Sequence, residues 1–311
     1  MMSNKVFNIQ CAGTIDSVAE LVQKLKEQKS PAASKPGAHL FFRGESKEYK
    51  DTFLLPRVYR PDCKKEENIY YYDALTNFPQ EFENLTNLSR LAKMQHYGYP
   101  TRLLDLTSNP LVALYFACCG DVKDNGRFYI IKTDEILNYD SDRALLLSSL
   151  SHLNKSQQES VYNFLCDFIE GKYYEAYNKR INSDFVHKEV EVDSDIRKSD
   201  KDGGFQFERL IGEAMRERSA FLNYNTVATD LLSSFIVRPL IQNERQKKQD
   251  GLFLIHGLFG DRSVNDLKKM DAVCFDIVNK ENIIKELELL GINQASLFGD
   301  LENRIKYLES T

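Results

Sequence analysis

The sequence lacks the segments that would place a protein in or across a membrane. No run of apolar residues reaches the ~18 that a membrane-spanning helix needs. The stretch at 1–17 also has no apolar core of the kind found in signal peptides. From these two absences we expect a cytoplasmic protein with no membrane partner.

Paired cysteines of the CxxC type are absent as well. The chain has 6 cysteines, and Cys118 and Cys119 are adjacent within an apolar stretch. This pattern predicts free thiols in a reducing compartment rather than a disulfide framework. No cluster of cysteine and histidine has the spacing of a zinc site, so we expect no metal.

The common catalytic and nucleotide-binding signatures are missing too. The chain contains no GxSxG elbow, Walker-type loop, GxGxxG turn or HExxH helix, which weakens the usual hydrolase and Rossmann interpretations. A net charge of -5 and a pI of about 5.7 argue against a broad surface for non-specific nucleic-acid binding. They do not exclude a local basic patch.

What is present indicates a globular α+β protein. The 311 residues are 42% hydrophobic and 28% charged, which is enough apolar surface for a core. Strands and helices are mixed without regular βαβ alternation. We expect strands at 38–44, 126–132, 233–239, 251–257 and 272–278, and helices at 14–28, 67–95 with a break near Pro79, 111–119, 134–177, 205–222, 280–291 and 296–308.

The segment at 95–110, QHYGYPTRLLDLTSNP, concentrates polar chemistry in what we interpret as a loop before an apolar helix. His96 precedes a constrained Tyr97-Gly98, and Arg102 lies three residues before Asp105. Two interpretations stay open for Arg102 and Asp105, namely a buried ion pair and a pair of ligand contacts.

The end of the same segment should begin the helix. Thr107, Ser108 and Asn109 are helix-capping residues that directly precede Pro110, which suits a first helical position. A helix start with exposed amides and hydroxyls can also hold a phosphate group. The two roles are compatible.

Arginines near two strand ends are further candidates. Arg43 ends an apolar strand and is followed by Gly44, so its guanidinium could grip a phosphate or carboxylate, or pair with Glu45 or Asp51. Arg57 and Arg60 form either a second anion contact or a plain surface pair.

A later segment supplies one more candidate. Arg245 and Gln249 would share a helix face just before the strand that begins at Gly251. Gln249 is therefore a candidate ligand contact at the entrance of that strand, or otherwise an exposed glutamine.

These residues resemble the FRG domain, named for its Phe/Tyr-Arg-Gly motif. The resemblance extends over most of the chain and divides it into an N-terminal part at 1–133, a helical insertion at 134–204 and a C-terminal part at 205–311. The blocks that carry it are FFRGES at 41–46, LLPRVYR at 54–60, QHYGYPTRLLDLTSNPLVALYFA at 95–117, RQKKQDGLF at 245–253 and LELLGINQASLFGDLENRIKYL at 287–308.

A weaker similarity links the chain to ADP-ribosyltransferases. That family uses a strand ending in arginine or histidine, then a Ser/Thr-x-Ser segment with a following helix, then a strand that begins with glutamate. LFFRGES and DLTSNPLVALYFA are similar to the first two elements, but Gly251 stands at the position of the glutamate. Asp105, Glu208 and Glu213 are candidates to supply the missing carboxylate.

The resemblance implies an ADP-ribosyltransferase-like split mixed/antiparallel sheet with surrounding helices and NAD or a related nucleotide as its ligand. It implies that ADP-ribose is transferred to a protein or nucleic-acid target, or that NAD is hydrolysed. The alternatives are a non-catalytic nucleotide or nucleic-acid sensor in phage or stress defence, and a purely structural set of motifs. The oligomeric state stays open. Expected catalytic residues are Asp105, His96 and Gln249; expected binding residues are Arg43, Gly44, Tyr97, Arg102, Thr107 and Ser108.

Overall fold

The computed structural model describes most of the chain. The described residues are 7–29, 38–49, 52–170, 204, 206–207, 209–210, 212, 229–241, 243–259 and 270–298. Nearly all of the residues at 187–204, a strongly polar stretch of the sequence, lie outside them, as do the candidates Glu208 and Glu213 and the end of the predicted closing helix. No helix in the described ranges is long and apolar enough to cross a membrane.

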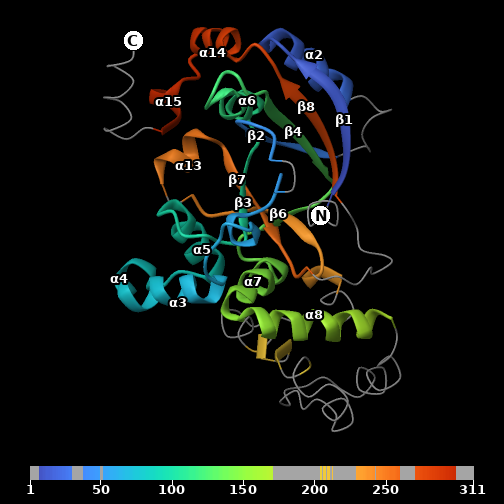
Figure 1. The fold of residues 1–311 in the computed structure, drawn as a ribbon. Coiled ribbons are helices and arrows are strands. Elements are labelled where there is room, and N and C mark those ends of the chain that lie inside the picture. Colours follow the sequence, from blue (N-terminus) through green and yellow to red (C-terminus); the bar gives the residue numbers. More distant parts are fainter. Residues whose placement is uncertain are drawn as a thin grey trace.

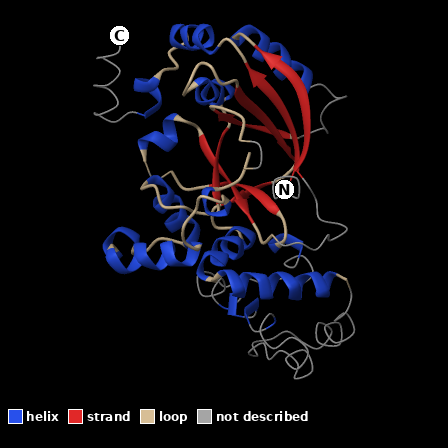
Figure 2. Ribbon diagram, viewed as in Figure 1, coloured by secondary structure: helices blue, strands red, loops and turns tan. Residues whose placement is uncertain are grey.

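Eight strands of the described residues form one mixed sheet, in the spatial order β1-β8-β4-β2-β3-β7-β6-β5 (Figures 1 and 2). β1 runs parallel to β8 and β5 parallel to β6, whereas the other neighbours are antiparallel. The strands are β1 (Phe7–Ile15), β2 (His39–Glu45), β3 (Leu103–Thr107), β4 (Gly126–Thr133), β5 (Ile136–Asn138), β6 (Ser234–Arg238), β7 (Gly251–His256) and β8 (Met270–Ile277).

The sheet is nearly split between its two central strands. β2 and β3 share a single register pair, Phe42 with Thr107, whereas β2 pairs with β4 along its whole length. Beyond that pair β2 and β3 separate, so main-chain groups on the facing edges lack ladder partners. Such groups need other hydrogen bonds, and the side chain of Arg43 supplies one of them.

The helices form two groups on the same face of this sheet (Figure 1). Phe42 packs under the first group and Leu103 under the second. Because Phe42 pairs with Thr107, and Thr107 alternates in phase with Leu103, both clusters lie on one face. The first group is α2 (Val18–Gln28), α6 (Pro110–Cys118) and α14 (Lys280–Leu289); the second is α3 (Glu67–Asn77), α5 (Asn87–His96), α7 (Asp142–Ser149) and α8 (Lys155–Ile169).

The opposite face is the inside of a curl. One apolar cluster there joins Phe7 on β1 to Ile236 on β6, with Leu54 and Leu104 between them. Strands from distant positions in the sheet can share one cluster only if the sheet bends around it. The two helix groups therefore cover the outer face, and the short α13 (Glu244–Lys248) lies over its middle, between them (Figure 1).

Local signals in the sequence set several element ends correctly. The side chain of Ser17 accepts a hydrogen bond from the amide of Glu20 at the start of α2, and Pro110 is the first residue of α6. Gly291 has φ of 78° after α14, and the Gly291 and Ile292 amides bond the carbonyls of Glu288 and Leu287. These two hydrogen bonds together form a Schellman motif.

Three strands were not predicted from the sequence. Residues 103–107, predicted as part of a loop, form the central strand β3, and β1 at 7–15 was not predicted. The predicted helical segment at 134–177 is helical in α7 and α8 but first adds the strand β5, which pairs with β6. α7 and α8 pack in the same apolar cluster as α3 and α5. Whether 134–204 is an insertion stays a prediction.

The other elements complete the frame. The predicted break in the helical segment at 67–95 is confirmed, since α4 (Pro79–Phe82) begins at Pro79. Residues 57–59 form the single turn η1 (Arg57–Tyr59), and η2 (Leu150–His152) follows α7. α15 (Gln294–Phe298) begins the predicted closing helix. The free thiols of the described residues are Cys63, Cys118, Cys119, Cys166 and Cys274. Of these, Cys118, Cys166 and Cys274 are buried.

Candidate functional site

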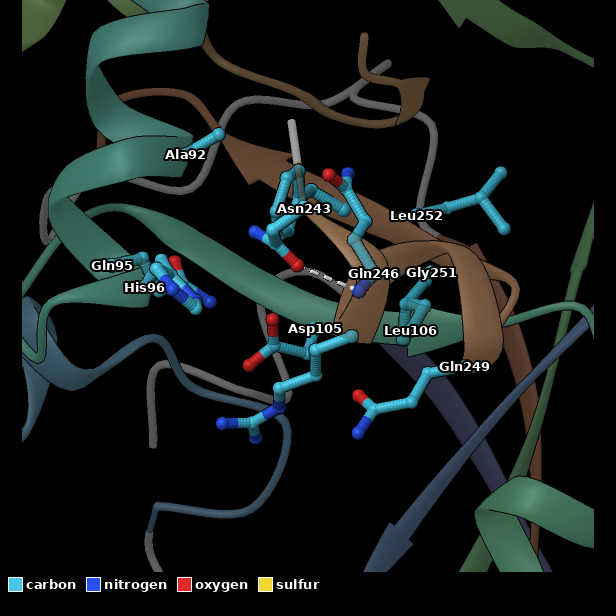
Figure 3. A pocket seen from close by; sticks show the side chains of 12 residues that line it. Ala92, Gln95, His96, Asp105, Leu106, Asn243, Gln246, Gln249, Gly251 and Leu252 are labelled. Atoms are coloured by element: carbon cyan, nitrogen blue, oxygen red, sulfur yellow. Dashed lines mark hydrogen bonds between the residues drawn. The ribbon is translucent and has the colours of Figure 1, made fainter. Parts of the chain in front are cut away.

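A polar cleft of about 110 Å³ opens on the outer face, between α5 and α13 and above β3 and β7 (Figure 3). It lies where the two helix groups separate. Ligand pockets that enclose a whole small molecule usually measure ~300–1,000 Å³, so this cleft can enclose only part of a nucleotide. Its lining residues are Ala92, Gln95, His96, Asp105, Leu106, Asn243, Arg245, Gln246, Gln249, Gly251, Leu252 and Phe253.

Asp105 supplies the carboxylate of the cleft. It is the exposed residue of β3, whose other four residues are buried. The helices that cover the neighbouring strand positions are absent above it, which explains this exposure. Among the described residues, no hydrogen bond or ion pair reaches its carboxylate. An unpaired carboxylate on a rigid central strand is suited to accept hydrogen bonds from a ligand.

His96 and Gln249 face Asp105 from two sides (Figure 3). His96 is the exposed last residue of α5, and Gln249 caps the end of α13. The Gln249 Nε2 donates to the Leu297 carbonyl at 3.3 Å, which leaves its Oε1 toward the cleft side as an acceptor. Three residues predicted from separate parts of the sequence thus meet around one cleft.

Three further side-chain amides line the cleft, those of Gln95, Asn243 and Gln246, and none of them was predicted from the sequence. The Oε1 of Gln95 accepts from Thr101 at 2.7 Å, and the Oδ1 of Asn243 accepts from the Gln246 amide at 2.7 Å. These bonds fix the orientation of the Gln95 and Asn243 side-chain amides, and they do not use the N–H donors of these groups. The one available signal was Asn243, a residue that prefers helix starts, immediately before α13.

Arg43 does not line the cleft: it pairs with Tyr129 of the inner-face cluster, whereas Asp105 pairs with Phe253 of the outer-face cluster, so the Arg43 side chain starts from the opposite face of the sheet and reaches into the gap between β2 and β3. Its Nη1 donates to the carbonyl of Asp105 at 2.7 Å, and its Nε pairs with Glu45 Oε1 at 3.1 Å. The guanidinium therefore fills the gap where β2 and β3 separate. The predicted pairing of Arg43 with Glu45 is confirmed. The contact of Arg43 with Asp105 is to the main-chain carbonyl of Asp105 and not to its carboxylate.

Thr107 and Ser108 serve the helix start and the strand end. The Thr107 hydroxyl donates to the Gln249 carbonyl at 2.6 Å and accepts from the Asn109 amide at 3.0 Å, while Asn109 caps α6 through the Leu111 amide. Thr107 thereby ties β3 to the end of α13. Ser108 is exposed, and its amide bonds the carbonyl of Asp250. The predicted capping role is filled by Asn109, and a phosphate contact at this helix start stays a prediction.

Gly44 is explained by packing. A Cβ at this position would lie 1.9 Å from the carbonyl oxygen of Ala113 and 2.5 Å from the amide nitrogen of Ala117. The backbone of α6 thus rests directly on β2, and a ligand is not needed to account for the glycine. Tyr97 is 59% exposed and contacts the ring of His96, with the ring centroids 5.4 Å apart, but it does not line the cleft.

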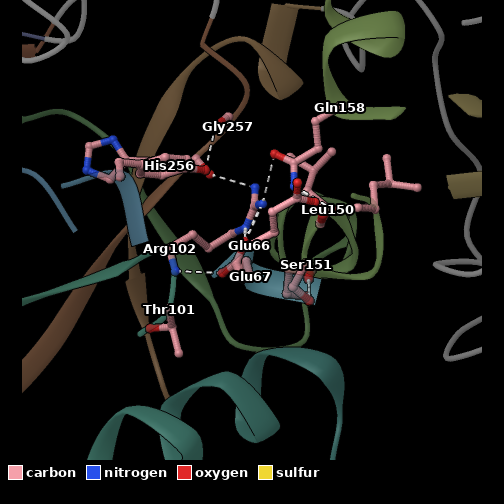
Figure 4. Close-up of polar contacts among 12 residues, drawn as sticks. Glu66, Glu67, Thr101, Arg102, Leu150, Ser151, Gln158, His256 and Gly257 are labelled. Carbon is pink, nitrogen blue, oxygen red and sulfur yellow. Dashed lines mark hydrogen bonds and ion pairs between the residues drawn. The ribbon is translucent and has the colours of Figure 1, made fainter. Parts of the chain in front are cut away.

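Arg102 does not reach the cleft, which corrects its expected role in binding. It is fully buried, and its Nη2 and Nε bond Glu67 Oε2 at 2.6 and 2.8 Å while its amide bonds Glu67 Oε1 at 2.7 Å (Figure 4). Burial is the largest single effect and lowers the pKa of Arg102, but the charge of Glu67, the neighbouring Tyr59 and the hydrogen bonds to Glu67 together raise the pKa above its ordinary value. The predicted buried ion pair exists, with Glu67 in place of Asp105.

The same buried group joins four elements. Arg102 Nη1 donates to the carbonyl of His256 at the end of β7, and Gln158 of α8 accepts from its Nη2 at 3.5 Å (Figure 4). Burial and the Arg102 charge lower the pKa of His256 to about 3, so the imidazole is neutral and bonds Ser234 at 2.9 Å. The network holds β3 and β7, the two strands beneath the cleft, against α3 and α8.

The arrangement suits recognition of a polar, largely uncharged group beside an anion. Asp105 and Gln249 offer acceptors, Gln95 and Asn243 offer donors, and His96 offers either, according to its protonation state. Arg245 adds a positive charge and stacks on Phe298 at 4.8 Å from the ring centroid. Ribose hydroxyls and the edges of heterocyclic bases present complementary donors and acceptors.

Comparison with known families identifies a domain in the first half of the chain. Residues 38–126 match the family model of the FRG domain. The chain contains an FRG domain. The matched range begins at β2, includes the cleft residues His96 and Asp105, and ends at the start of β4. No curated protein and no solved structure matches the chain. Gln249 and the rest of α13 lie outside the matched range.

Proposed function

We propose that the cleft of this FRG-domain protein binds NAD or a related nucleotide. The observation that carries the proposal is the unpaired carboxylate of Asp105, held on a buried strand between His96 and Gln249. The volume of the cleft matches one ring or sugar of such a ligand better than the whole molecule. The phosphates would then lie outside it, toward the helix start at Ser108 and the split beside Arg43.

The order of elements supports an ADP-ribosyltransferase-like use of this cleft. Arg43 on β2, Thr107 on β3 with the following helix α6, and Gly251 on β7 are the three elements of the resemblance. Phe42, next to Arg43, pairs with Thr107, and Thr107 pairs with Gly251. The elements are therefore neighbours in the sheet, at the point where it splits.

Asp105 is the candidate that could replace the missing glutamate. Asp105 pairs with Phe253, and Thr107 pairs with Gly251, so positions 105 and 251 are diagonal neighbours on one face. Diagonal neighbours of an antiparallel pair lie about 7–8 Å apart. A carboxylate at Asp105 could thus stabilise the positive charge that develops at a ribose carbon when nicotinamide leaves.

Replacement of Asp105 by asparagine should weaken NAD binding by roughly tenfold or more, because a hydrogen bond to a charged group contributes about 1.5–3 kcal/mol. The side chain is exposed, so thermal stability should change little. Isothermal titration calorimetry of NAD with wild type, Asp105→Asn and the exposed-turn control Asp124→Asn measures this. Equal affinities in all three proteins would contradict the proposed site.

Binding without turnover is the second candidate function, and Gly251 favours it. With no carboxylate at that position, the ordinary transfer chemistry loses its main electrostatic support. The protein would then act as a nucleotide or nucleic-acid sensor in phage or stress defence. Mass spectrometry after incubation with NAD and cell lysate separates the two functions. Free nicotinamide or new adducts that vanish in Asp105→Asn indicate an enzyme, whereas unchanged NAD that still binds indicates a sensor.

A further inference from the structure

Two half-buried arginines lie together beside the split of the sheet. Arg43 on β2 bonds Glu45 Oε1, which also accepts from the Leu54 amide at 3.3 Å, and Arg60, just after η1, bonds the adjacent Leu55 carbonyl at 3.0 Å, so both guanidinium groups are held at the same turn. The pKa of Arg60 is lowered by its burial and, to a smaller extent, by the positive charge of Arg43. Glu45 is bonded to Arg43, and its charge acts in the opposite sense on Arg60. Asp62 also acts on Arg60, but it is exposed and makes no bond to it.

Each guanidinium is held in place by the main chain. Arg43 Nη1 donates to the Asp105 carbonyl at 2.7 Å, and Arg60 Nε donates to the Leu55 carbonyl at 3.0 Å. The Arg60 guanidinium also lies over the ring of Tyr49, 5.7 Å from its centroid. The two side chains are therefore ordered before any ligand arrives, which lowers the entropic cost of binding.

Most of the donors of this pair are unused. A guanidinium has five N–H groups, and contacts within the described residues use two of them in Arg43 and one in Arg60. Two other arginines, Arg127 and Arg143, are neutralised more fully, since Arg127 pairs with Glu48 and Asp276, and Arg143 pairs with Glu135 and Asp230. Among the described residues, only Arg43 of the two fixed cations is bonded to a carboxylate, that of Glu45, so the pair keeps an excess of positive charge.

We propose that Arg43 and Arg60 form an anion site for a phosphate or pyrophosphate group. Two guanidinium forks match the oxygens of such a group in geometry and charge. Arg60 is thereby added to the binding residues, and η1 to the elements that form the site. If the proposed function is correct, the pyrophosphate of a nucleotide that reaches through the gap between β2 and β3 is the natural occupant, because Arg43 lies in that gap and bonds the Asp105 carbonyl, while the Asp105 carboxylate lines the cleft on the other face.

The proposal rests on the proposed function only for the identity of this occupant, so two separate probes test it. Inorganic pyrophosphate probes the arginine pair alone, and adenosine, which has no phosphate, probes the cleft alone. We expect Arg60→Gln to lower the affinity for pyrophosphate roughly tenfold or more, and the affinity for adenosine not at all. Lys155→Gln, which removes an exposed charge at the start of α8, should change neither.

Loss of pyrophosphate and NAD affinity in Arg60→Gln supports the site with the nucleotide as occupant. Loss of pyrophosphate affinity alone supports the site with another phosphate compound as occupant. No pyrophosphate binding by the wild type, or equal losses in Arg60→Gln and Lys155→Gln, overturns the proposal. If Arg60→Gln does not fold, Arg60→Lys decides: it keeps the charge without the fork, so an unchanged affinity for pyrophosphate also overturns the proposal.

Discussion

Replacement of Glu67 by alanine is expected to lower the free energy of unfolding by about 3–5 kcal/mol, one of the two largest effects of a single substitution that we predict. Glu67 accepts three hydrogen bonds from Arg102, which is fully buried. Without Glu67, Arg102 keeps weaker contacts to the His256 carbonyl and Gln158, and its charge has no buried counter-ion. Urea denaturation followed by circular dichroism measures the loss.

The neighbouring Glu66 is the matched control. It is exposed, and its carboxylate accepts from the Lys155 amide at 2.9 Å, so Glu66→Ala should cost no more than about 1.5 kcal/mol. A double variant, Glu67→Leu with Arg102→Met, should recover most of the loss, because apolar residues of similar volume can replace a buried ion pair. If Arg102→Met instead left stability unchanged and removed NAD binding, the structural role of Arg102 would be wrong.

This pair also marks where sequence reasoning stops. Arg102 and its partner are separated by 35 residues, and spacing along a chain carries no information on contacts at that distance. Asp105, only three residues away, was therefore the natural but incorrect choice. Apolar runs act locally, and for that reason β2, β4 and β7 and the end of α14 near Gly291 were predicted correctly.

β3 was missed for a related reason. Its five residues follow Gly98 and Pro100 and precede Pro110, and the polar Asp105 stands in their middle. Such a segment has the composition of a loop. It forms a strand because β7 pairs with all five residues and helices cover most of one face, and both causes are tertiary.

The candidate site was partly predictable because the resemblance joined distant segments. His96, Asp105 and Gln249 were chosen from two blocks that lie about 150 residues apart in the sequence, and they line one cleft. The amides of Gln95 and Asn243 were not chosen, since a glutamine or asparagine at a helix end has no distinctive pattern. Their role depends on the fixed orientation of the amides, which only the contacts to Thr101 and Gln246 reveal.

Gly44→Ala is expected to have the second large effect, a loss of about 3 kcal/mol in the free energy of unfolding, at the upper end of the usual cost of overpacking. The added Cβ would lie 1.9 Å from the Ala113 carbonyl oxygen, and overpacking that meets backbone cannot be relieved by a rotamer change. α6 would have to move away from β2. Thermal and urea denaturation of the variant measure the loss.

Gly251→Ala is the matched control for Gly44→Ala. Its Cβ would lie 3.3 Å from the flexible Gln246 side chain and from the Gln246 carbonyl, so a shift of a few tenths of an ångström suffices. A small loss of stability is expected there. The comparison decides between the two explanations of the glycine after Arg43. If Gly44→Ala folds with unchanged stability and fails to bind NAD, close approach of a ligand requires the glycine; if it loses stability as predicted, the packing of α6 on β2 requires it, and the ligand contacts of this strand belong to Arg43 alone.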